Sequence, residues 1–143
     1  MRRILIVAHK TLAGEHLREE VKRRLEEGEC SFHLLVPEQH PNDHAWTDGE
    51  VERAAEKVLE EGLQSFRELD PTGGTAFTGE VGEANPLHAV DLLFIRGESF
   101  DEIIVSTLPP GRSHWLKKDV PTRMRHEYTL PITHVVADRV PAH

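Results

Sequence analysis

Short, almost purely apolar runs recur along the chain, and between them apolar residues are spaced three or four positions apart. The runs predict strands that are buried on both faces, the usual arrangement in a parallel sheet. The first run covers residues 3–8 (RILIVA), and others cover residues 31–36, 102–107 and 131–136. Residues 72–81 predict a further strand, because Thr75, Phe77 and Val81 follow a pair of glycines there.

The segments between these runs predict amphipathic helices, because their apolar residues fall on one face and their charged residues on the other. Leu17, Val21 and Leu25 form one such face, and the helix is expected to end at Gly28. The next helix should begin near Asp48. Its start is marked by Thr47 with Glu50. Asn85 and Pro86 open a further helix over residues 86–96. A last helix, from Ser113, has a basic outer face and an apolar face formed by Trp115, Leu116, Val120 and Met124.

This regular alternation of strands and helices predicts an α/β protein. We expect one open five-stranded parallel sheet with helices on both faces, a Rossmann-like arrangement, in a single domain spanning residues 1–143. Ligands of such sheets bind beyond the carboxyl ends of the strands, where loops meet helix N-termini. A ligand site is therefore expected near residues 106–114.

Composition narrows the classes of function. The net charge is −8, but residues 106–143 carry six Lys or Arg against three Asp or Glu, so this part has a charge of +3 and the remainder −11. The acidic remainder argues against a nucleic-acid partner and is compatible with a local anion pocket. No run approaches the ~20 apolar residues of a membrane span. With a single cysteine, Cys30, and no signal-peptide pattern, we expect a cytoplasmic protein without membrane association.

Two segments, RILIVAHKT at residues 3–11 and DEIIV at residues 101–105, each begin with or contain a predicted strand, and their order and spacing are informative. With them the chain resembles the universal stress protein family: the first segment stands in place of the family's opening strand and its Asp-x-Ser turn, and the second stands in place of its fourth strand. Trp115 and Leu116 mark the following helix, and residues 131–136 (PITHVV) stand in place of the closing strand. The resemblance covers nearly the whole chain. It implies the strand order 3-2-1-4-5, an adenine nucleotide as ligand, and a homodimer formed through the last strand, here Ile132–Val136.

The chain departs from the family at the phosphate-binding loop. ATP-binding members carry Gly-x2-Gly-x9-Gly-Ser/Thr, whose glycines let the backbone approach the phosphates. Aligned from the strand, the first two glycine positions fall on Ser106 and Pro109, and aligned from the helix the Gly-Ser pair falls on Lys118 and Asp119. Proline has no N–H to donate, and Asp119 adds a negative charge, so the sequence predicts a degraded ATP-binding loop. The family's Asp at the end of the first strand is replaced by His9.

Other polar residues are candidates for an altered site. Gly111, Arg112 and Ser113 offer a permissive glycine, a guanidinium and a capping hydroxyl just before a helix, which suits AMP, ATP or another phosphate-bearing ligand. In the alternative interpretation Ser113 only caps the helix, and Arg112 and Lys10 are solvated surface charges. The candidate ligand-binding residues are His9, Lys10, Ser106, Thr107, Gly111, Arg112, Ser113 and Lys118.

Three functional hypotheses follow. The first is a non-catalytic regulatory or stress-response module that acts as a homodimer, and the second is a nucleotide- or phosphate-binding protein that uses residues 111–113. The third is a phosphate-ester hydrolase, in which Ser106, Thr107 or Ser113 would be paired with His9 or His114. The chain has no Gly-x-Ser-x-Gly motif, and with ten histidines such pairs arise by chance, so a non-catalytic function is favoured.

A metal site is not expected. His40, Asp43 and His44 have ligand chemistry within five residues, but Pro41 prevents the helical spacing that would place both imidazoles on one face. This segment is interpreted as a solvated loop.

Overall fold

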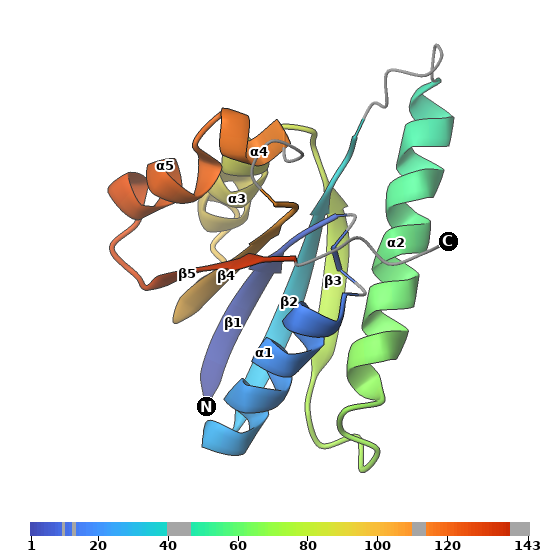
Figure 1. The fold of residues 1–143 in the computed structure, drawn as a ribbon, viewed down its shortest axis with the longest axis vertical. Coiled ribbons are helices and arrows are strands. Elements are labelled where there is room, and N and C mark those ends of the chain that lie inside the picture. Colours follow the sequence, from blue (N-terminus) through green and yellow to red (C-terminus); the bar gives the residue numbers. More distant parts are fainter. Residues whose placement is uncertain (10, 13, 40–46, 110–113, 138–143) are drawn as a thin grey trace.

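The computed structural model describes residues 1–9, 11–12, 14–39, 47–109 and 114–137, and its strands and helices alternate along the chain (Figure 1). The elements in chain order are β1 Arg2–Val7, α1 Glu15–Glu27, β2 Cys30–Pro37, α2 Asp48–Arg67, β3 Phe77–Gly82, α3 Pro86–Ile95, β4 Glu102–Thr107, α4 His114–Lys117, α5 Val120–Glu127 and β5 Ile132–Val136.

The five strands form one parallel sheet in the order β3-β2-β1-β4-β5, which confirms the predicted fold class and strand order. β1 lies at the centre, where Ile4 is opposite Phe32 of β2 on one side and Glu102 of β4 on the other. Ile4 through Val7 are completely buried. A central strand is covered on both faces, which explains why the first run of the sequence is apolar without interruption.

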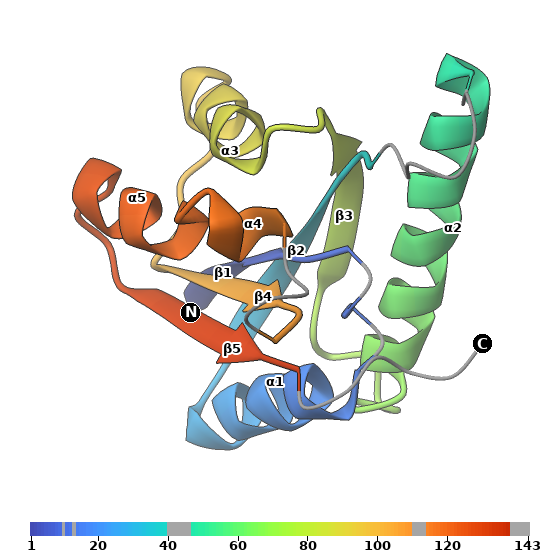
Figure 2. The ribbon, with the colours of Figure 1, turned by 45° about the horizontal axis from the view of Figure 1, so that its top comes forward.

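Helices cover the two faces of the sheet separately (Figures 1 and 2). α1 and α2 lie on the face formed by Ile4, Ile6 and Ile104, where Leu17 of α1 and Phe66 of α2 are buried. The opposite face is covered by α3, α4 and α5. Its core contains Leu5, Val7, Ile103 and Val105 of the sheet together with Val90, Leu93, Trp115, Val120 and Met124 of the helices.

Two predicted helix starts are confirmed by their capping geometry. The backbone N–H of Glu50 donates to Thr47 Oγ1 over 3.2 Å, and the Glu50 side chain returns to the Thr47 backbone, so both halves of the capping box are present. Asn85 Oδ1 accepts from the backbone N–H of Leu87 (3.1 Å) and of His88 (3.4 Å), with Pro86 in the first turn. These side chains satisfy N–H groups that have no partner within their helices.

The single helix predicted from Ser113 onward is wrong, because the structure divides it into α4 and α5. Asp119, between the two, adopts a left-handed backbone conformation with φ of 54°. Pro121 explains the break: it has no N–H for the helical hydrogen bond, and its ring would collide with the preceding turn. Proline is tolerated in the first turn of a helix, so α5 starts anew at Val120. The predicted apolar face persists, since Trp115, Val120 and Met124 are all buried.

The third strand starts later than the predicted range of residues 72–81. The residues before Phe77 form a turn in which Thr75 Oγ1 donates to Asp70 Oδ2 over 2.6 Å and Gly73 has φ of 75°. Glycine adopts this left-handed conformation without a steric penalty. The glycine pair therefore belongs to the turn that precedes the strand.

Among the helices of the described ranges, none combines the length and apolar character required to cross a lipid bilayer.

Candidate ligand site at the carboxyl ends of β1 and β4

The connections that follow the adjacent parallel strands β1 and β4 lead to opposite faces of the sheet. After β1 it passes to α1 on one face of the sheet, and after β4 it passes to α4 on the other face. The connections therefore change face between these two strands, and in open α/β sheets a ligand usually binds in a crevice beyond the carboxyl ends of such a pair; this position is referred to as the crevice. This is the edge at which the sequence predicted a site.

A buried hydrogen-bonded group joins the two strands at this crevice. Thr11 Oγ1 lies 2.6 Å from Ser106 Oγ, and His16 Nε2 lies 3.1 Å from the same Ser106 oxygen. Thr11 and Ser106 are only 2% and 1% exposed. Ser106 is the penultimate residue of β4, Thr11 lies in the loop after β1, and His16 is the second residue of α1. Ser106 therefore ties three segments together that are distant in the sequence.

Local structure explains how Thr11 and His16 reach Ser106. Two turns follow β1, in which Leu12 N–H donates to His9 C=O (3.1 Å) and Gly14 N–H donates to Thr11 C=O (2.9 Å). A Cβ on Gly14 would lie 2.7 Å from Cε1 of His16, closer than a carbon atom can approach. The missing side chain at Gly14 thus makes room for the His16 ring at the start of α1.

Thr107 lies on the opposite face of β4 from Ser106. Its Oγ1 lies 2.8 Å from Nε2 of His134 in the adjacent strand β5. Burial, with a smaller contribution from the nearby Arg125 guanidinium, lowers the pKa of His134 below its ordinary value. The neutral imidazole is therefore the main form at neutral pH, and it can either donate to or accept from the Thr107 hydroxyl.

The structure places the remaining candidate residues in different ways. His9 lies two residues after the end of β1, with its backbone carbonyl in the first turn. Lys118 lies in the turn between α4 and α5, exposed, with its backbone N–H donating to Trp115 C=O over 3.2 Å. Lys10, Gly111, Arg112 and Ser113 lie outside the described residues, as do His40, Asp43 and His44. Within the described part of the chain, no group of three or more His, Cys, Asp or Glu side chains could hold a metal ion.

Sequence reasoning did not single out Thr11 or His16 as site residues. In the sequence, Thr11 is marked only as the end of the segment that resembles the family, and no pattern marks His16. The available signal was positional, because both residues lie between the first strand and the start of the first helix, where loops of this fold meet ligands.

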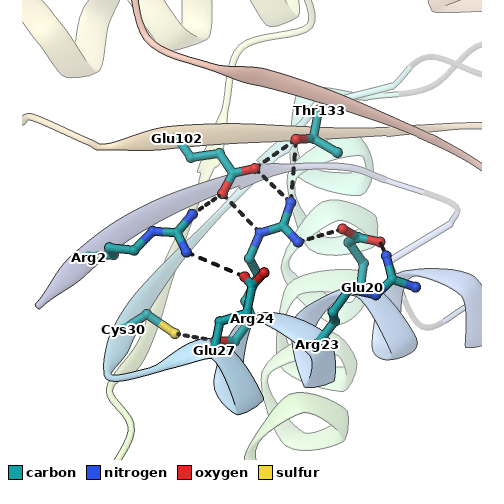
Figure 3. Close-up of polar contacts among 8 residues, drawn as sticks. All are labelled: Arg2, Glu20, Arg23, Arg24, Glu27, Cys30, Glu102 and Thr133. Atoms are coloured by element: carbon teal, nitrogen blue, oxygen red, sulfur yellow. Dashed lines mark hydrogen bonds and ion pairs between the residues drawn. The ribbon is translucent and has the colours of Figure 1, made fainter.

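A second polar group lies at the amino ends of the strands, away from the crevice (Figure 3). Glu102 of β4 is 4% exposed and accepts from Arg24 Nε (3.0 Å) and Nη2 (2.7 Å), from Arg2 Nη2 (2.8 Å) and from Thr133 Oγ1 (2.7 Å). Burial opposes ionisation of Glu102, but the hydrogen bonds from Arg24 and Thr133 outweigh it and keep the pKa of the carboxyl below its ordinary value. This group joins α1 to three strands, β1, β4 and β5, and so links elements of the fold.

The fold defines a class of protein, an open parallel α/β domain with a buried polar group between β1 and β4, where the strand order reverses. A scan against protein-family models found no match, and a search of curated proteins found none either. Among solved structures, the chain is similar to a universal stress protein in complex with cAMP, with a TM-score of 0.53 and 11% identity over 94% of this chain and 96% of that chain. At this identity the likeness establishes the fold, which the two chains share over almost their whole lengths.

Proposed function

We propose that this protein is a non-catalytic regulatory module of the universal stress protein kind, which binds a nucleotide or another phosphate-bearing ligand between β1 and β4. The observation that carries the proposal is the hydrogen-bonded group of Thr11, Ser106 and His16 at the carboxyl ends of these two strands. The similar structure supports it, because that universal stress protein is in complex with cAMP.

The chemistry of the crevice favours a ligand of low charge over a triphosphate. Two hydroxyls and an imidazole offer hydrogen bonds without a permanent positive charge, and they suit a ligand with one negative charge, such as a cyclic or simple phosphodiester. A triphosphate needs several backbone N–H donors or cations. Pro109 cannot supply such a donor, and Ser106 occupies a position where the family has glycine, so we propose that the loop has lost the family's ATP-binding geometry.

The hydrogen bonds of Ser106 favour a binding role over a hydrolase that uses it as a nucleophile. The contact between Ser106 and His16 has the distance of a nucleophile with its general base. However, Ser106 Oγ also lies 2.6 Å from Thr11 Oγ1, so its hydroxyl is shared between two partners and is not held by His16 alone. Sustained turnover of ATP or a model phosphate ester by highly purified protein, lost in Ser106→Ala, would favour the hydrolase instead.

Binding is tested by thermal unfolding in the presence of cAMP, AMP, ATP or inorganic phosphate. A ligand at one hundred times its Kd stabilises the folded state by about 2.7 kcal/mol, which is an increase in Tm of roughly 5–10 °C for a chain of this size. We expect the largest increase with cAMP or AMP, and a much smaller one in Thr11→Val and Ser106→Ala. Thr78→Val is the matched control, because it removes a strand hydroxyl that contacts His33 away from the crevice. Equal increases in all variants would contradict the assigned site.

We also propose that the module is a homodimer formed through β5. β5 is an edge strand, and its sequence Ile-Thr-His-Val-Val contains no Lys, Glu or Pro of the kind that usually protects an exposed edge. The other edge strand, β3, is less suited to pairing. It carries Gly79 and Glu80, and Arg67 of α2 already donates to the Phe77 carbonyl over 3.0 Å.

A further inference from the structure

The backbone of β5 presents a regular set of hydrogen-bonding groups on its open side. Pro131 C=O accepts from Ile103 N–H (3.0 Å) and Ala137 N–H donates to Thr107 C=O (2.9 Å), so both residues face β4. Successive residues of a strand face alternately to its two sides, and Thr133 and Val135 therefore face β4 as well. The N–H and C=O groups of Ile132, His134 and Val136 point the other way, toward the open edge.

The side chains of these three residues all lie on the sheet face covered by α3, α4 and α5. Ile132 packs against the core of that face, and His134 reaches Thr107. Val136 is 37% exposed and belongs to the small group of large apolar side chains exposed within the described residues. The edge is therefore apolar at both ends and carries a titratable group in its middle.

Building on the dimer proposed above, we propose that two copies pair their β5 strands antiparallel about a two-fold axis at His134, and that acid weakens this pairing. In this register Ile132 lies opposite the partner's Val136, Val136 lies opposite the partner's Ile132, and His134 lies opposite the partner's His134. Each of these pairs can exchange two backbone hydrogen bonds, because all the outward-facing residues meet outward-facing residues.

Other registers satisfy fewer groups. A shift of one residue places outward-facing groups opposite residues that already face β4, and a shift of two residues leaves one outward-facing residue of each copy beyond the pairing. The register centred on His134 also covers the exposed Val136 with an isoleucine, and cross-strand pairs of aliphatic side chains stabilise a sheet. The open edge of β5 therefore pairs with a second copy of itself most completely in the register centred on His134.

This register brings two imidazoles together across the two-fold axis. Directly opposed residues that exchange hydrogen bonds have Cα atoms about 5.5 Å apart. Arg125 of α5 lies near each imidazole, β4 contributes only the neutral Thr107, and Arg24 of α1 is bound to Glu102 on the other face of the sheet. Protonation would thus place two new positive charges beside two existing ones, with no carboxylate facing them among the described residues.

The direction of the pH effect follows from linkage. The pairing favours neutral His134, so it is strong at neutral pH and weakens as the pH falls through the pKa of His134. Burial and Arg125 already hold this pKa below the ordinary value of about 6.5, which places the loss in the range below it. Repulsion between two charges at this separation predicts dissociation about tenfold stronger or more at about pH 5 than at about pH 7.5.

Sedimentation equilibrium at about pH 7.5 and about pH 5 tests the proposal. We expect a dimer that dissociates on acidification in the wild type, and equal dissociation constants at both pH values in His134→Gln, which keeps a hydrogen-bonding group near Thr107. His88→Gln is the control, since His88 pairs with Glu83 away from β5 and its loss should leave the pH effect unchanged. A wild-type monomer at both pH values would overturn the dimer itself. A dimer equally stable at both, or an unchanged pH effect in His134→Gln, would overturn only the inference about His134.

Disulfide formation tests the register independently. In a Cys30→Ala background, His134→Cys should form an intermolecular disulfide on mild oxidation, because the Cα separation across the axis lies within the range that a disulfide spans. Thr133→Cys is the matched control, since Thr133 would lie opposite the partner's Val135 and two equivalent cysteines there would be too far apart. Faster cross-linking of Thr133→Cys than of His134→Cys would refute this register.

Discussion

The buried ion pair of Glu102 with Arg24 offers the sharpest prediction about stability (Figure 3). Replacing Glu102 with Leu leaves the Arg24 guanidinium, 11% exposed, without its two hydrogen bonds of 2.7 and 3.0 Å. Removing one partner of a buried pair typically lowers the free energy of unfolding by 3–5 kcal/mol. We expect about 3 kcal/mol, because Glu20 still pairs with Arg24 at 2.7 Å, which corresponds to a decrease in Tm of roughly 6–12 °C.

Urea unfolding followed by circular dichroism measures this free energy, and a double-mutant cycle separates the pair from its surroundings. Glu102→Leu with Arg24→Met should be less destabilised than Glu102→Leu alone, because no unpaired charge remains buried. Glu27→Gln is the control: Glu27 pairs with Arg2 at 3.5 Å between half-exposed side chains, and its loss should change stability by less than about 0.5 kcal/mol. A double variant less stable than Glu102→Leu would refute the reasoning.

The same pair predicts part of the acid sensitivity of the fold. The pKa of Glu102 in the folded state lies below its ordinary value, so its contribution to stability is present above the unfolded pKa of about 4.3 and is lost as the pH falls through the folded pKa. In Glu102→Gln the free energy of unfolding should therefore fall less steeply below about pH 4 than in the wild type. An identical slope in both proteins would show that other carboxylates control acid unfolding.

Further predictions concern three glycines. Gly62→Ala should lower the free energy of unfolding by about 1–3 kcal/mol, because its Cβ would lie 2.4 Å from Cδ2 of the buried Leu12. Gly49→Ala, in the same helix, meets only the end of the Arg53 side chain and should be neutral or slightly stabilising in the same urea experiment. Gly14→Ala should displace the His16 ring from Ser106 and reduce the ligand-induced increase in Tm, whereas an unchanged increase would separate His16 from binding.

The central strands were predictable because residues that are buried on both faces of a sheet are apolar, and consecutive apolar residues can be recognised in the sequence. Ile4 to Val7 and Ile103 to Val105 are completely buried, and each appears as an uninterrupted apolar run. The break between α4 and α5 was not predicted, although Pro121 is present in the sequence. The apolar spacing continues across the break from Trp115 to Met124, so periodicity alone predicts one helix. The backbone constraint of Pro121 divides this segment into two helices.

The location of the site was predictable, but its hydrogen-bonded group was not. The carboxyl ends of β1 and β4 follow from the order of elements, which identified Ser106 as a candidate. Its partners depend on how the chain turns after β1: Thr11 and His16 lie 95 and 90 residues from Ser106, and the turns and the space at Gly14 bring them to it. No local pattern records such a meeting of distant residues.

The most direct test of the proposed site is a titration of ¹⁵N-labelled protein with cAMP, in which the chemical shifts of the backbone amides are measured at each step. The account predicts that the shifts that change most belong to the segments after β1 and β4, including Thr11, His16 and Ser106, with saturation at one ligand per chain. No change at these amides, or changes confined to a surface such as the exposed side of α2, would contradict it.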